Sequence, residues 1–269
     1  MKVFKKRLKF YNSKKKFSFM FPLKYLFGFT EYNKILYLIK IRLELNLKTE
    51  SEINSNIFYG STGTTGKLKF NKVELHIPHI TPSYDIEKKV LARLNTGKPI
   101  DVVFFKRSMN SKTIDTGENC SWVLGSYTNS VRFVYVVFKN QDISIEKNNA
   151  LFTGSKIKSL KLQLNGMYYP ISGMKFNFEE NNIAEPYYAY IQACKTQGVE
   201  PQLSLLDFLL YPIFCFDTSA QPESLKSHGI NLTLKIEKDS TVKLEGFALI
   251  LEDSYFKIDV GNGTMLRIS

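Results

Sequence analysis

The chain has 269 residues, with 37 Lys and Arg against 25 Asp and Glu and a formal net charge of +12. Its hydrophobic content of 43%, with 21 Phe and 15 Tyr against one Trp, favours pleated, half-buried β surfaces over a helical bundle. Its three cysteines form no CxxC pair and are too few for a disulfide framework, so we expect a reducing compartment.

Much of the positive charge lies at the start of the chain. Such an arm can neutralise phosphates by releasing counterions, act as a nuclear address, or stay solvated. No sequence-specific motif accompanies it, so nucleic-acid or anionic contact is a candidate role beside the simpler one of a solvated arm. The eight basic residues are Lys2, Lys5, Lys6, Arg7, Lys9, Lys14, Lys15 and Lys16.

The apolar run FSFMFPLKYLFGF follows this arm. It is broken by Pro22 and Lys24 and is shorter than the ~20 residues that a bilayer span needs. No small-residue cleavage site follows it, as a signal peptide would require. We therefore expect no membrane span, a basic N-terminal arm over 1–21, and a short helical turn over 22–29.

Two alternating segments come next, over 35–48 and 67–78. In the first, apolar residues from Ile41 to Leu47 alternate with polar ones, which predicts a half-buried strand. The second alternates too, with a slip in phase at Asn71 and Lys72 that suggests a bulge. The intervening STGTTG is a turn.

A helix is predicted next, because Ser83 can cap it, Ile86, Val90 and Leu94 recur at helical spacing, and Gly97 ends it. We interpret 81–98 as a linker helix between two β units.

The remainder is rich in short strands. Helical periodicity returns only over 184–197 and 203–211, and Asn165-Gly166 marks a tight hairpin turn. Strands are predicted over 99–106, 121–127, 131–138, 156–164, 213–217, 230–237 and 242–251. Residues 99–260 are therefore expected to form a mainly β, antiparallel jelly-roll sandwich with a few short helices in long loops, followed by a loose tail over 261–269.

Catalytic and metal-binding patterns are incomplete. His76 and His79 could reach one metal ion, but neither a carboxylate nor a cysteine completes the set. A triad using Ser224 or Cys215 with His228 has no GxSxG element.

Two further patterns are weak. In GSTGTTGK the glycine and lysine spacing of a phosphate loop is met, but Leu68 replaces the hydroxyl residue and a strand is predicted to follow. The acidic pairs Glu179-Glu180 and Glu252-Asp253 are interpreted as solvated loop and strand-end charges. We therefore predict no catalytic residue, no metal and no cofactor.

Several segments resemble the double jelly-roll major capsid proteins of the Polinton (Maverick) and adintovirus group, including copies embedded in animal genomes. They are FPLKYLFGF with ELNL, KVELHIPHITPS, VRFVYVVFKNQ, KIKSLKLQLNGMYYP, MKFNF, YPIFCFDTSAQPESLKSHGINLTLKIE and FALILEDSYFKID, in the order of the family. The closing turn carries Asp217, Ser219, Gln221, Glu223, Ser224, Leu225 and Lys226. The resemblance covers about 22–260.

The resemblance has two departures. Only the last strands of a first jelly roll are present, over 22–80, and FFKRSMNSKT replaces an aromatic, acidic stretch, which indicates a diverged loop. A shortened first roll would leave strand edges and an apolar face uncovered, unless they pack on the second roll or on another subunit.

The resemblance implies a structural virion protein that assembles with copies of itself into pseudo-hexagonal trimers and a shell, together with other capsid proteins. Before assembly it would lie in the host nucleus or cytoplasm. One alternative is a host-domesticated or vestigial jelly roll that contacts nucleic acid through its basic arm. A carbohydrate-binding or enzymatic jelly roll would need a concave face lined with aromatics and carboxylates.

Overall fold

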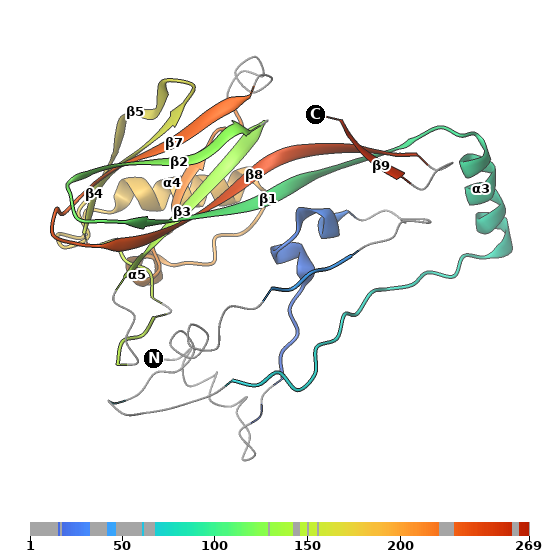
Figure 1. Ribbon diagram of the computed structural model, residues 1–269, viewed down its shortest axis with the longest axis horizontal. Coiled ribbons are helices and arrows are strands. Elements are labelled where there is room, and N and C mark those ends of the chain that lie inside the picture. Colours follow the sequence, from blue (N-terminus) through green and yellow to red (C-terminus); the bar gives the residue numbers. More distant parts are fainter. Residues whose placement is uncertain are drawn as a thin grey trace.

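The computed structural model describes residues 16, 18–32, 42–46, 61, 68–128, 130–141, 146–149, 151–154, 156–220, 229–259 and 264–268. Figure 1 shows a sandwich of two β-sheets with helices beside it, and a separate helix, α3, at one end of the molecule. Residues 18–32 and 68–80 run outside the sandwich.

All strand pairs are antiparallel, and the strands divide between two sheets. The β1 sheet has the order β1-β8-β3-β6, and the β2 sheet has the order β2-β7-β4-β5. The strands are β1 (Ile100–Ile114), β2 (Asn119–Thr128), β3 (Val131–Asn140), β4 (Ile157–Leu164), β5 (Met167–Lys175), β6 (Phe214–Asp217), β7 (Ile230–Lys238) and β8 (Leu244–Asp259). This is the strand order of an eight-stranded jelly roll, which confirms the predicted fold class.

The core lies between the sheets because apolar residues alternate along their strands. Leu232, Leu234 and Ile236 of β7 are buried, whereas the residues between them are not. Trp122 of β2 packs directly on β8, where a Cβ atom at Gly246 would lie 2.6 Å from the indole ring. Large side chains facing small ones let the two sheets interdigitate.

Two helices cover part of the outer face of the β1 sheet. Residues of α4 (Ala184–Thr196) and α5 (Leu205–Leu210) pack with Cys215 of β6 and Tyr135 of β3 in a second apolar cluster. The Tyr190 hydroxyl accepts hydrogen bonds from the backbone N–H groups of Gln202 and Leu203, at 3.0 and 3.2 Å. The loop between the helices is thereby fixed to α4.

Strand β1 is longer than predicted, and the segment expected to be a diverged loop belongs to it. Its polar residues face inward near the border of the sandwich. Asn110 Nδ2 donates to the carbonyl of Leu124 at 2.8 Å, and Lys112 Nζ donates to that of Ser121 at 2.8 Å. Polar side chains thus occupy positions where an alternating pattern would place apolar ones.

The strand prediction is wrong for 68–78 and for the described part of 35–48. Residues 42–46 and 68–80 are extended but join no sheet of the described residues. Alternation alone does not make a strand, because ladder hydrogen bonds need a neighbouring strand. The GSTGTTGK turn lies largely outside the described residues.

The short elements before the sandwich agree with the helical predictions. Over 22–29 the chain forms two 3₁₀ turns, η1 (Leu23–Tyr25) and η2 (Gly28–Glu31). The helix α3 (Tyr84–Asn95) follows Ser83, whose side chain makes no capping hydrogen bond, and none of its residues is buried.

The tail is not loose, contrary to the prediction. Strand β9 (Thr264–Ile268) pairs with β8, from Tyr255↔Ile268 to Asp259↔Thr264. The pairing of β8 with β3 ends at Glu252, but β8 continues to Asp259. The flank of β8 that faces β3 is therefore not occupied by β3 over its last residues, and β9 pairs there.

Candidate assembly surface

The segment 23–32 packs against strand β1, which forms one edge of the β1 sheet. Gly28 is buried there, and a Cβ atom at this position would lie 1.6 Å from the carbonyl oxygen of Phe105. No side chain fits in that space, so only glycine allows this approach of the two backbones. Gly28 is therefore the residue that seats the segment on β1.

Aromatic and charged contacts hold the segment on both sides of Gly28. The Phe29 ring meets Phe104 edge-on at 5.5 Å between centroids. Glu31 forms an ion pair of 2.6 Å with Arg107, whose side chain is only 14% exposed and also donates to the backbone carbonyl of Lys24. Sequence reasoning did not identify Gly28 or Arg107 as contact residues, because they lie far apart along the chain.

The same segment reaches the beginning of β1. The Tyr32 hydroxyl donates to the carbonyl of Asp101 at 3.4 Å. Carbonyls two and four residues apart along a strand point to the same side, so those of Asp101 and Phe105 lie on one flank. Residues 23–32 thus cover the edge of β1 between these two positions.

The edge strands β2, β5 and β6 are protected in different ways. Carbonyls at the β2 edge accept the hydrogen bonds from Asn110 and Lys112. Strand β5 carries Pro170, after a cis peptide bond, and a bulge that includes Gly173 at a φ of +79°. Strand β6 has only four residues. Proline, bulges and short length all discourage pairing with a foreign strand.

Apolar side chains nevertheless remain uncovered on the outer face of β1. Val103, Phe105 and Met109 are 63%, 38% and 67% exposed and lie on one face, because they alternate with the inward residues of the strand. We call these three residues the β1 patch. Arg107 lies between Phe105 and Met109 on this face but is mostly covered through its pair with Glu31, so the exposed side chains there are mainly apolar, as on interaction surfaces.

Most of the predicted basic contact residues lie outside the described part of the chain. Among the eight, the structure describes only Lys16, and its side chain is exposed. In the family-like closing turn, Asp217 Oδ1 accepts hydrogen bonds from the backbone N–H and the hydroxyl of Ser219, at 2.8 and 2.5 Å. Residues 221–228, with Ser224 and His228, are outside the description.

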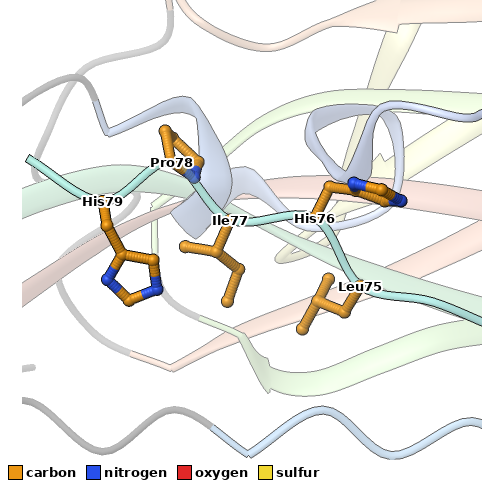
Figure 2. Close-up of a pocket in the computed structure, with 5 residues that line it drawn as sticks. All are labelled: Leu75, His76, Ile77, Pro78 and His79. Carbon is orange, nitrogen blue, oxygen red and sulfur yellow. The ribbon is translucent and has the colours of Figure 1, made fainter.

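The histidines of HIPH do not converge. Figure 2 shows the rings of His76 and His79 on opposite sides of an extended, exposed segment, with Ile77 and Pro78 between them. Within the described residues, no group of three His, Cys, Asp or Glu side chains could hold a metal ion.

The other titratable candidates have structural partners. Cys215 is buried under α4, and burial raises the pKa of its thiol well above the ordinary value. Glu252 is also buried, with Lys106 Nζ at 3.4 Å, so its prediction as a solvated charge is wrong. Its neighbour Asp253 pairs with Arg132, and Glu179 pairs with Lys156 at 2.9 Å.

The chain matches the double jelly roll-like domain family over residues 3–255 and belongs to that family. No curated protein matches. Among the described residues, no helix is long and apolar enough to cross a membrane.

Solved viral capsid structures are similar to this chain. The structure of the Sputnik virophage has 14% sequence identity and a TM-score of 0.40, over 64% of this chain and 39% of that chain. The mavirus major capsid protein has 10% identity and a TM-score of 0.34, over 62% and 41%. The PBCV-1 virus capsid has 12% identity and a TM-score of 0.39, over 67% and 54%. The matched regions thus span between about two fifths and just over half of the length of these proteins.

Proposed function

We propose that this chain is a structural major capsid protein of a double-stranded DNA virus or integrated virus-like element, of the Polinton (Maverick) and adintovirus group. Its family membership over residues 3–255 is the observation that carries the proposal. The eight-strand jelly roll supports it as well, because the sandwich interior is filled by side chains and the outer surface remains for function.

In this proposal the protein acts with copies of itself as pseudo-hexagonal trimers, which then form a shell with other capsid proteins. The β1 patch supports self-association, since interface centres are enriched in apolar and aromatic side chains and depleted of charge. The protected strand edges favour self-association into rings as well. They hinder open-ended pairing of strands between copies, so the contacts between copies are made by side-chain surfaces, whose fixed geometry can close a ring. The mature protein would lie in the virion.

The domain division belongs to the same proposal. Residues 22–80 would be the end of a first roll, 81–98 the linker, and 99–260 the second roll. The seating of 23–32 on β1 supports this, because it provides the contact that the end of a first roll would make with the second.

Mass measurement after size exclusion, with electron microscopy of the same fractions, tests the assembly. We expect trimers from the unaltered chain and loss of trimers in Val103→Lys, with an unchanged melting temperature because Val103 is exposed. The matched control is Val199→Lys, an exposed valine after α4. A monomer at every concentration, or equal loss in both variants, would contradict the proposal.

The alternative is a domesticated or vestigial binding module that uses the basic arm. Deletion of residues 1–16 separates the two functions. Loss of DNA retention in the deleted chain, together with absence of particles from the full chain at every salt concentration, would favour the binding module. Particle formation by the full chain would favour the capsid subunit.

A further inference from the structure

Two lysines face each other at the centre of the outer face of the β2 sheet. The register places Lys161 of β4 directly opposite Lys235 of β7, and Ser121 of β2 opposite Lys235 on the other side. Inward residues of these strands form the core, so this row points outward. Like charges directly opposite each other destabilise a sheet.

Both lysines are held in place by their neighbours. The stem of Lys161 lies over Gly173, where a Cβ atom would be 2.4 Å from Lys161 Cε. Lys235 Nζ donates to the hydroxyl of Ser121 at 3.0 Å. Lys112 Nζ reaches the carbonyl of the same serine, so a third ammonium group lies at the rim of this row.

These three ammonium groups form no ion pair with a described carboxylate. Glu237, two residues along β7, is the acidic residue of this face, and the register places Ser159 opposite it. Lys175 of β5 lies opposite Ser159 on the other side. The centre of the face thus keeps its positive charge.

Other lysines on or next to the same sheet form ion pairs with carboxylates, unlike Lys161 and Lys235. Lys156, just before β4, pairs with Glu179 at 2.9 Å, and Lys158 of β4 pairs with Glu118 at 3.1 Å. Carboxylates are therefore available around this sheet, but none lies directly opposite Lys161 or Lys235. A counter-charge from outside the chain would relieve the repulsion.

The rest of the face suits phosphate oxygens. Neutral hydrogen-bonding side chains lie beside the lysines: Ser121 is opposite Lys235, Thr233 and Gln163 form the next pair along the strands, and Tyr168 lies opposite Gln163. Hydroxyl and amide groups commonly contact phosphate and sugar in nucleic-acid complexes. The helices α4 and α5 pack mainly against the β1 sheet, on Cys215 of β6 and Tyr135 of β3, and not on this face.

We propose that the outer face of the β2 sheet binds the phosphate backbone of duplex nucleic acid without sequence preference, with Lys161 and Lys235 as its phosphate contacts and Lys112 at the rim. Duplex DNA carries about one charge per 1.7 Å of its axis, which complements several ammonium groups spread over a flat face. The binding requires neither trimer formation nor the basic arm.

The test measures binding of a short duplex DNA to the full-length chain over a series of salt concentrations. In K161Q/K235Q we expect weaker binding and a salt slope lower by about 2, one for each lost phosphate contact. The matched control is K156Q/K158Q, which removes the same charge from paired lysines and should keep most of the slope. The basic arm contributes equally to both variants.

Melting temperature separates lost binding from lost folding. K161Q/K235Q should melt no lower than the unaltered chain, because the substitution removes a repulsion. An equal loss of binding in the two double variants would overturn the proposal, since it would show only an effect of total charge. Loss of binding to vesicles rich in anionic lipid, with unchanged DNA binding, would overturn it in favour of a membrane surface.

Discussion

The sandwich and the segment 68–80 share the same alternating pattern but differ in what surrounds it. Leu162 of β4 is 0% exposed between β5 and β7, whereas Leu75 is 48% exposed in an extended stretch. The pattern decides which side of a strand is apolar, but neighbouring strands and an opposing sheet decide whether that side is buried. The difference is therefore one of partners rather than of composition.

The largest expected effect is a matched pair of truncations. Leu162→Ala removes a fully buried side chain and should lower the free energy of unfolding by about 2–5 kcal/mol. Leu75→Ala should change it by less than about 0.5 kcal/mol, because the side chain has little to lose. Urea denaturation measures both. A similar decrease in the free energy of unfolding in the two variants would show that Leu75 is buried in solution. It would contradict the difference in burial between the sandwich and the segment 68–80.

A smaller effect is expected where the segment 23–32 contacts the sandwich. Gly28→Ala places a methyl group against the Phe105 carbonyl and should weaken the seating of 23–32 by about 1–3 kcal/mol. Hydrogen exchange should rise over 22–32 and stay unchanged in β3. Gly97→Ala is the control: its φ of +65° strains alanine, but no atom lies within 4 Å of its Cβ position, so exchange over 22–32 should stay unchanged. Unchanged exchange in Gly28→Ala would mean that the contact is not formed.

The smallest effect concerns the turn between β7 and β8. Hydrogen bonds from the backbone N–H and the hydroxyl of Thr241 hold the pKa of Asp239 below its ordinary value. A carboxyl with a lowered folded-state pKa adds stability above its unfolded-state pKa, and this is lost as pH falls through the folded-state pKa.

Thr241→Val removes the hydroxyl donor, so the pKa of Asp239 should rise toward its unfolded-state value and the stability lost on acidification should become smaller. Carboxyl titration by NMR, with denaturation at several pH values between about 5 and 2, measures both changes. An unaltered titration of Asp239 in the variant would show that the hydroxyl bond does not contribute.

Most of the sandwich could be predicted from the sequence, and the exceptions have physical causes. Alternation identified strands such as β4 and β7, whose inward residues are apolar apart from the buried Lys238 at the end of β7. The second half of β1 was missed because Asn110 and Lys112 turn inward to bond the β2 edge. Strand β9 was missed because its pairing depends on how far β8 extends.

The candidate surfaces were less predictable, because they depend on register. Nothing in the local sequence places Lys161 opposite Lys235, and Gly28 looks like an ordinary turn residue until Phe105 lies beside it. The basic arm was the visible electrostatic signal, and its role stays a prediction. The LFGF element was visible as a family-like segment, but its contact with β1 was not.

The flanks of the outer strands have a consequence for how copies of this chain can meet. In the described sandwich, the flanks of β2, β5, β6 and the start of β1 are bonded by side chains, kinked, very short or covered. Backbone-to-backbone growth is thereby hindered, so crowding many copies together should not seed fibrils. Contacts between copies must then be made by side chains. When such a contact joins each copy to the next at a fixed angle that divides a full turn, the copies form a closed ring.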